Sequence, residues 1–242
     1  MRASIPGLIP MLLARALLVV ALLATTPALA DSLEIGPTRL QMVGPERTTT
    51  LTIRNSNDTP ANIQIRALDW SQPDGTDQYS PSTLLLASPP QVSLAPGESQ
   101  VIRVVIENLP AADREHAFRL MIDQIPSEQS PGGAGVRTAV RALVPVFVTA
   151  TVADRPSLQW RAVRNGTTVT LTVVNAGPAH DRIVGAAVTA NGAPIGDPIE
   201  GYVLADAQRS WTLEGVPGDA RSLSIAGEGE FGEVRADVPL AP

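Results

Sequence analysis

Residues 135–148 read GVRTAVRALVPVFV, and this stretch has the alternation of a β-strand. In its first half one face carries apolar or β-branched residues and the other carries arginines: Val136, Thr138 and Val140 against Arg137 and Arg141. An average strand has only ~5–6 residues, whereas this one would span roughly 45 Å at ~3.3 Å per residue. Pro145 lacks the N–H of a ladder, which is tolerated at a sheet edge but not in its centre. The stretch therefore predicts a long edge strand.

Alternation with a period of two continues through the rest of the chain after residue 30. The runs cover residues 49–53, 63–67, 101–106, 118–122, 169–173 and 184–188. Turn-forming residues separate them at 55–60, 72–75, 95–97 and 191–192. Because no twelve-residue window has a helical stripe, the regularly spaced strands predict an all-β chain of immunoglobulin-like β-sandwiches.

Chain length indicates two such sandwiches. One immunoglobulin-like sandwich takes about 100 residues, and 242 − 30 = 212 residues follow residue 30. The stretch VADRP at residues 152–156 is the natural joint. We therefore expect an N-terminal domain over residues 31–151 and a C-terminal domain over residues 156–242, joined by a short linker.

The first 30 residues have the pattern of a secretory signal peptide. Arg2 supplies a basic start, ALLVVALLA at residues 16–24 is a short apolar core, and ALA at residues 28–30 matches a small-x-small cleavage site. A membrane anchor is the alternative, but Arg15 interrupts the apolar stretch, which is shorter than the ~20 residues of a spanning helix. We expect cleavage after Ala30, export, and no membrane insertion.

Composition excludes several classes of function. The chain has 242 residues, a formal net charge of −6, no cysteine, and 18 basic residues that are all arginine. Without cysteine there is no disulfide framework, thiol nucleophile or zinc–thiolate site. Without lysine there is no P-loop lysine and no Schiff-base chemistry. The negative charge argues against nucleic acid as a partner.

The side chains that could carry catalysis do not form a convincing site. His116 and His180 fall in different expected domains, so they predict surface or strand-end positions rather than a metal site. Asp123 with Asp113 or Glu115 could form an acid pair, but solvated charge is the better interpretation. Gly-rich residues 227–232 match a dinucleotide fingerprint by spacing alone, and they predict a turn between the last two strands because no helix follows. We expect no enzyme activity, metal or cofactor.

Several motifs occur in a fixed order along the chain. They are GPTR at residues 36–39 in the first strand, LAPG at 94–97, DRE at 113–115, FRL at 118–120, IP at 125–126, RALVPVFV at 141–148, VLA at 203–205 and RSW at 209–211. In this order and spacing the sequence resembles the periplasmic PapD-like chaperones of the chaperone–usher pathway. The resemblance implies two immunoglobulin-like domains set at an angle, and a periplasmic location.

The resemblance also implies a mechanism and partners. A PapD-like chaperone lends its seventh strand to an incomplete pilin sandwich and delivers the subunit to an outer-membrane usher. Parity then assigns the inserted face, with Ala142 as its last member: Val136, Thr138, Val140 and Ala142. No nucleotide, metal or other cofactor is implied. The exposed edge strand could also support self-association of the free chaperone.

Family members set the register by gripping the pilin C-terminal carboxylate with basic residues. In the best-known members these are an arginine on the first strand, which corresponds to Arg39, and a lysine on the seventh, where this chain has Pro145. The PVFV ending and Phe118-Arg119 resemble the archaic branch, associated with spore-coat-U-type subunits, and there Arg119 is the replacement. A guanidinium offers a carboxylate two parallel bonds. Arg39 could instead pair with a local acid such as Glu34, and Arg119 could be an exposed strand arginine.

Two other classes of function compete with this reading. One is an exported two-domain adhesive or structural module, but a fimbrial subunit would carry its alternating donor residues in an N-terminal extension rather than mid-chain. The other is a secreted glycan-active protein. The sequence offers that class little, because its three Trp and two Tyr form no evident aromatic platform.

Overall fold

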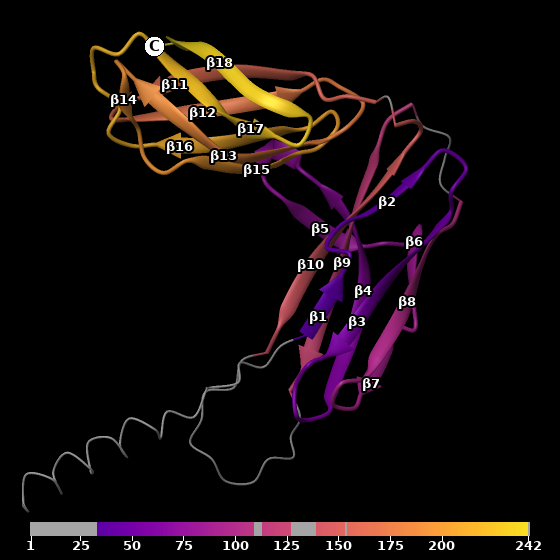
Figure 1. The fold of residues 1–242 in the computed structure, drawn as a ribbon. Helices are drawn as coiled ribbons and strands as arrows, with labels where there is room; N and C mark the ends of the chain where they lie inside the picture. Colours follow the sequence, from indigo (N-terminus) through magenta and orange to yellow (C-terminus); the bar gives the residue numbers. More distant parts are fainter. Residues whose placement is uncertain (1–32, 109–112, 127–138, 153, 242) are drawn as a thin grey trace, which may run out of the picture. The chain divides into compact units, whose positions relative to one another are not determined.

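The computed structural model of the chain describes residues 33–108, 113–126, 139–152 and 154–241 (Figure 1). The expected signal peptide at residues 1–30 and the expected donor residues Val136 and Thr138 lie outside these ranges. All described residues fall within one compact unit. Their regular structure is β-strand apart from a 3₁₀ turn at Pro73–Gly75, and they include no helix that is long and apolar enough to cross a membrane.

The first ten strands form two sheets. One has the order β1-β3-β8-β6, and the other has the order β2-β10-β9-β4-β5, with β7 also paired to β4. Their bounds are β1 (Leu33–Gly36), β2 (Leu40–Val43), β3 (Thr48–Asn55), β4 (Ala61–Ser71), β5 (Gln78–Pro81), β6 (Leu85–Ser88), β7 (Gln91–Leu94), β8 (Ser99–Ile106), β9 (His116–Ile125) and β10 (Arg141–Thr149).

Alternation along these strands produces the first core. In β3, Leu51 and Ile53 are fully buried while the threonines between and beside them face solvent. The buried series of both sheets meet in one cluster, to which β8 contributes Ile102, Val104 and Ile106. The two sheets therefore pack as a sandwich. The strands predicted at residues 49–53, 63–67, 101–106 and 118–122 are confirmed.

The remaining strands form one sheet with the order β14-β13-β17-β18-β11-β12-β16, with β15 paired to β13. They are β11 (Leu158–Asn165), β12 (Thr168–Asn175), β13 (Asp181–Ala190), β14 (Ala193–Pro194), β15 (Ile199–Val203), β16 (Gln208–Leu213), β17 (Ser222–Gly229) and β18 (Gly232–Ala241). This sheet encloses a second, separate core. The strands predicted at residues 169–173 and 184–188 are confirmed, as is the glycine-rich turn between β17 and β18.

Each core has a buried asparagine with the same pattern of contacts. Both Asn55 and Asn175 are fully buried. In each, the side-chain oxygen accepts the N–H two residues on, and the amide nitrogen donates to the carbonyl four residues on and to two consecutive carbonyls of a later segment. These acceptors are Thr59, Leu94 and Ala95 for Asn55, and Ala179, Val203 and Leu204 for Asn175. The second group of strands therefore repeats a structural element of the first.

Strand β10 pairs with a neighbouring strand along nearly all of one edge but along only part of its other edge. Strand β9 pairs with β10 from Arg141 to Val148, whereas β2 pairs in parallel with β10 only from Val146 onward. The N-terminal half of β10, from Arg141 to Pro145, is therefore an open edge among the described residues. This agrees with the edge position that Pro145 predicts.

The direction of the backbone groups follows from the register. The Gln124 amide donates to the Val140 carbonyl at 2.9 Å, so the even-numbered residues of β10 bond to β9. The N–H and C=O groups of odd-numbered residues then point to the open side. Pro145 belongs to this odd series, so its missing N–H removes no bond to β9.

Two strand predictions need correction. Within the described residues, strand β10 begins at Arg141, and Ala139 and Val140 precede it outside the assigned strand. The assignment of residues 36–39 to the first strand holds only for Gly36. Strand β1 ends at Gly36 and β2 begins at Leu40, so Arg39 lies between two strands that belong to different sheets.

Candidate functional site

The outer face of the β4-β9-β10 sheet, which points away from the first core, carries the candidate site. Even-numbered residues of β9 and β10, such as Leu120 and Val144, pack into the core, so the odd-numbered ones face outward. The register places Leu68, Arg119 and Pro145 side by side across the three strands. This row lies where β10 changes from covered to open.

The Arg119 guanidinium is packed against aromatic rings. Its Cζ lies 3.7 Å from the centroid of the Trp70 ring and 5.1 Å from that of Tyr202. Its Nη1 donates to the Leu143 carbonyl at 3.1 Å, and that carbonyl belongs to the series that points to the open side of β10. The residue is only 8% exposed, so the alternative of an exposed strand arginine is wrong.

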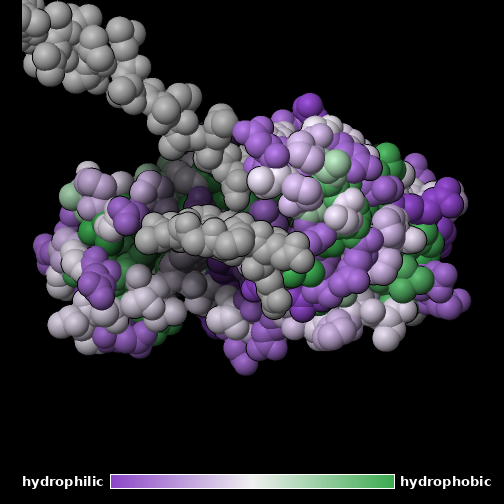
Figure 2. All heavy atoms as spheres, turned by 90° about the horizontal axis from the view of Figure 1, so that it is seen from below, coloured by the Kyte–Doolittle hydropathy of each residue, from purple (hydrophilic) through white to green (hydrophobic). Residues whose placement is uncertain are grey.

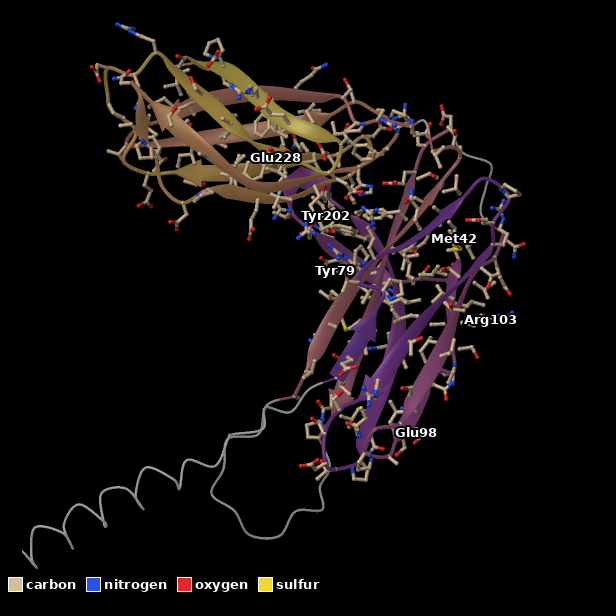
Figure 3. The ribbon with its side chains drawn as sticks, viewed as in Figure 1. Met42, Tyr79, Glu98, Arg103, Tyr202 and Glu228 are labelled. Carbon is tan, nitrogen blue, oxygen red and sulfur yellow. The ribbon has the colours of Figure 1, made fainter. Side chains whose placement is uncertain are left out.

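The environment of Arg119 is under-satisfied for a cation. Burial lowers the pKa of Arg119, while Tyr79 and Tyr202 (both labelled in Figure 3) and Asp77 oppose this shift. Its Nε is buried and finds no hydrogen-bond partner among the described residues, and none of their carboxylates forms an ion pair with it. A guanidinium nevertheless stays charged in a protein. A carboxylate that reached this group would therefore compensate a charge and satisfy a donor together.

Arg39 flanks the same row from the other side of β10. The register of β2 with β10 starts with Leu40 opposite Val146, so Arg39 stands beside Pro145, one residue before the pairing. Arg39 lies in the bend just before β2, where its side chain is 39% exposed and not part of the first core. Both candidate arginines thus flank Pro145.

Arg39 has a partner that the sequence did not predict. Its Nη1 forms an ion pair with Glu230, and the two side chains are 39% and 22% exposed. The suggested local acid, Glu34, instead accepts a hydrogen bond from Ser56 and pairs with Arg54. The alternative pairing of Arg39 with Glu34 is therefore wrong.

Val140 and Ala142 are the described members of the expected inserted face. Both are half-buried, and Ala142 packs against the edge of the first core. They continue the even series that buries Val144 and Val146 further along β10. A cavity of about 530 Å³ opens beside Val140, and Ile125 also lines it. The inserted face remains a prediction for all four of its residues, because its first two are not described.

A buried histidine lies behind the Arg39 pair. His180 Nδ1 lies 2.7 Å from Glu115 Oε1, and both side chains are only 2% exposed. The His180 ring stacks on Phe147 with centroids 3.6 Å apart, and its Nε2 lies 3.4 Å from Glu230 Oε2. The prediction of a strand-end position is correct for His180, which directly precedes β13, but a surface position is wrong. Glu115 is not a solvated charge either.

The aromatic side chains cluster, contrary to the reading that they form no platform. The rings in contact around Arg119 are Trp70, Tyr79, Phe147 and Tyr202. A signal was present in β4, where burial changes from odd residues at Ala61 to Ile65 to even residues at Leu68 and Trp70. Such a change of parity indicates a strand that is covered on both faces at one end.

Most of the molecular face shown in Figure 2 is polar or neutral, with hydrophobic residues in separate patches. Large exposed hydrophobic side chains occur singly, as at Val101, and at the open edge, as at Leu143. Scattered apolar residues are ordinary on a protein surface. The open edge is therefore distinguished by its unpaired backbone and its arginines rather than by hydrophobicity.

Comparison with known proteins relates these features to a family. Residues 32–151 match the family model for "Pili and flagellar-assembly chaperone, PapD N-terminal domain". A search of curated protein sequences found no significant match.

Solved structures of chaperones have the same fold. The chain is similar to the CsuC–CsuE chaperone–tip adhesion subunit complex of archaic Csu pili from Acinetobacter baumannii, with a TM-score of 0.69 and 22% identity over 87% of this chain and 100% of that one. The Salmonella enterica SafA pilin–SafB chaperone complex has a TM-score of 0.60 and 22% sequence identity to this chain, and the E. coli chaperone DraB has a TM-score of 0.59 and 21% identity. Each match covers 86% of this chain and 97% of the other. The family match and this shared fold together place the chain among the PapD-like periplasmic chaperones of pilus assembly.

Proposed function

We propose that this chaperone binds pilin subunits by donor-strand complementation, with β10 completing an unfinished subunit sandwich. The observation that carries the proposal is the open edge at Arg141–Pro145, which has a strand on one side only and an arginine on each side of its inner end. An added strand would take up the backbone groups that this edge leaves free. The SafA pilin–SafB chaperone complex, in which a protein of the same fold binds a pilin, supports pilin binding as the function.

The energetics of the edge favour strand addition. Each backbone bond to the outward groups of Arg141 and Leu143 would contribute about 0.5–1.5 kcal/mol net. Each valine of the inserted face would contribute about 1.5–3 kcal/mol on burial in the subunit groove, and Thr138 less. The inserted residues Val136, Thr138, Val140 and Ala142 share parity with the chain's own core residues. The subunit core would then continue the chaperone's core in one layer.

Arg119 and Arg39 are the proposed anchors for the subunit's C-terminal carboxylate. Both flank Pro145, where a lysine stands in the best-known relatives. Arg119 is the stronger of the two, because its charge has no ion-pair partner among the described residues and its Nε lacks an acceptor. This arrangement, in a chain without lysine, supports placement in the archaic branch.

Further parts of the proposal concern location and other partners. We infer that residues 1–30 are removed on export to the periplasm, and that the domains span residues 31–151 and 156–242. The chaperone would then deliver its subunit to an outer-membrane usher. The edge that receives a subunit also offers a surface for self-association of the free chain.

Co-purification of a pilin subunit with the chaperone tests the proposal. Val140→Asp should abolish capture, because a charged side chain cannot enter an apolar groove without a large desolvation cost. The matched control is Val101→Asp on β8 of the other sheet, where the valine is 53% exposed. Equal capture by the two variants would contradict the assignment of the donor strand.

A further inference from the structure

The group that holds Arg39 in this structure is itself a carboxylate. Glu230 lies in the two-residue turn between β17 and β18, and its side chain forms the ion pair with Arg39 Nη1. The Glu230 carboxylate thus occupies Nη1 of Arg39, although the proposed function assigns the Arg39 guanidinium to the C-terminal carboxylate of a partner.

The backbone at Glu230 is fixed, while its side chain has two partners. Its N–H donates to Asp181 Oδ1 at 2.9 Å and to the Arg182 carbonyl at 3.0 Å. One carboxylate oxygen meets Arg39, and the other lies 3.4 Å from His180 Nε2. The His180 ring is itself held by Glu115 through Nδ1. Glu230 could therefore leave Arg39 and keep a polar neighbour.

The balance of charge separates the two arginines. Arg39 and Glu230 cancel each other, whereas Arg119 has no ion-pair partner among the described residues. A second carboxylate arriving at Arg39 would meet Glu230 at short range, and like charges repel there. The Arg39 side chain is 39% exposed, so the pair is weak enough to be exchanged.

We propose that Glu230 is a specificity-determining residue, an internal carboxylate that a partner's C-terminus must replace at Arg39. This inference rests on the proposed function of Arg39 as an anchor. A free carboxylate, which brings no strand, competes poorly with Glu230. A chain end that also pairs with β10 gains enough from the backbone bonds to displace it. Glu230 thus makes the site select carboxylates that terminate a strand.

The test compares Glu230→Gln with the wild type. Glutamine keeps the side-chain length and an oxygen that can accept from Arg39, but it removes the competing charge. The matched control is Glu228→Gln (Glu228 is labelled in Figure 3), which removes the same charge from an exposed position in the same hairpin. Urea denaturation of all three proteins verifies that each is folded.

The binding probe is the peptide acetyl-Thr-Val-Thr-Val-Thr-Val, used as the free acid and as the C-terminal amide. Glu230→Gln should raise the preference for the acid over the amide by about two- to fivefold, the range for an exposed ion pair, and Glu228→Gln should leave it unchanged. If Glu230→Gln leaves the preference for the acid unchanged or lowers it, the proposal is overturned. A lower preference is what we would expect if Glu230 only held Arg39 in place for the partner. If wild type and Glu230→Gln both bind acid and amide equally, the carboxylate anchor itself fails. A wild-type preference for the acid that Glu230→Gln does not increase overturns only the role of Glu230.

A second measurement needs no ligand. The full-length chain is modified with phenylglyoxal and then digested, and mass spectrometry of the digest measures the modification of Arg39. The rate reports how accessible the Arg39 guanidinium is to the reagent. The rate should increase in Glu230→Gln and stay at the wild-type value in Glu228→Gln. Equal rates in all three proteins would show that Glu230 does not occupy Arg39, and the proposal would fall.

Discussion

Replacing Arg119 by methionine should separate stability from function. Methionine is unbranched, flexible and uncharged, so its shorter side chain can follow the first part of the arginine path toward Trp70 and Tyr202. The substitution removes the contact with the Trp70 ring and the hydrogen bond to the Leu143 carbonyl. It also removes a buried cation whose Nε has no acceptor among the described residues.

The opposing contributions nearly cancel. The lost cation–π contact is worth up to about 2 kcal/mol, and the lost charged hydrogen bond about 1.5–3 kcal/mol. Relief of the unsatisfied Nε–H returns about 1–3 kcal/mol, and burial of the methionine returns about 1.5–3 kcal/mol. Replacement of buried charge by apolar groups is often neutral for this reason. We expect the free energy of unfolding of Arg119→Met to stay within about 1.5 kcal/mol of the wild type, while subunit capture is lost.

Urea denaturation followed by tryptophan fluorescence measures the first quantity, and co-purification of a pilin subunit measures the second. Arg103→Met is the control, because Arg103 is an exposed residue of β8 (labelled in Figure 3). Destabilisation of Arg119→Met by more than about 3 kcal/mol would show that the arginine is retained for packing. Subunit capture equal to that of Arg103→Met would refute its role as an anchor.

Four further substitutions test the energetics of the fold. Burial raises the pKa of Asp77, but hydrogen bonds from Gln72, an indole and a guanidinium outweigh it and lower the pKa. The stabilisation is therefore present above the unfolded pKa and lost as pH falls through the folded one. Asp77→Asn should cost about 1 kcal/mol at pH 7 in urea titrations, and this cost should shrink as pH falls below about 4. Burial raises the pKa of Asp181, so its ionisation destabilises the fold as pH rises above about 4. The free energy of unfolding of Asp181→Asn at pH 7 should therefore equal or exceed that of the wild type. A clearly lower value at pH 7 would contradict this. Gln72→Ala should lower the free energy of unfolding by about 2–4 kcal/mol, because it leaves the buried Leu204 N–H and the Tyr202 carbonyl without the hydrogen bonds that Gln72 makes to them. Asn175→Ala should cost a similar amount through its three carbonyl acceptors, and thermal melts showing less than about 1 kcal/mol would refute its structural role.

The strands could be predicted from the sequence because their faces differ in polarity. The alternation of Leu51 and Ile53 with threonines in β3 is a local pattern that fixes both the element and its buried face. Prolines and glycines marked the turns by the same local logic. The family resemblance rested on short motifs spaced along these strands, and it led to Arg119.

What the sequence did not reveal depends on contacts between distant segments. Glu115 and His180 are 65 residues apart, and Arg39 and Glu230 are 191 apart. No periodicity relates such pairs, so isolated charged residues read as solvated. The matching roles of Asn55 and Asn175 were equally hidden, since an asparagine at a turn is common and only the fold shows that both side chains bridge the same kind of carbonyl pair.

Pro145 has a consequence for how far an added strand can advance. Among the outward-pointing residues of the open edge, Arg141 and Leu143 each supply an N–H donor, whereas Pro145 supplies none. From Val146 onward β2 already occupies the side that a newcomer would need. A partner strand that pairs along this edge from Arg141 toward Val146 therefore finds no N–H donor at Pro145. One residue further, at Val146, strand β2 blocks any more pairing. We therefore expect Pro145 to limit how far a partner strand can pair with this edge, and so to help set the position of the partner's chain end.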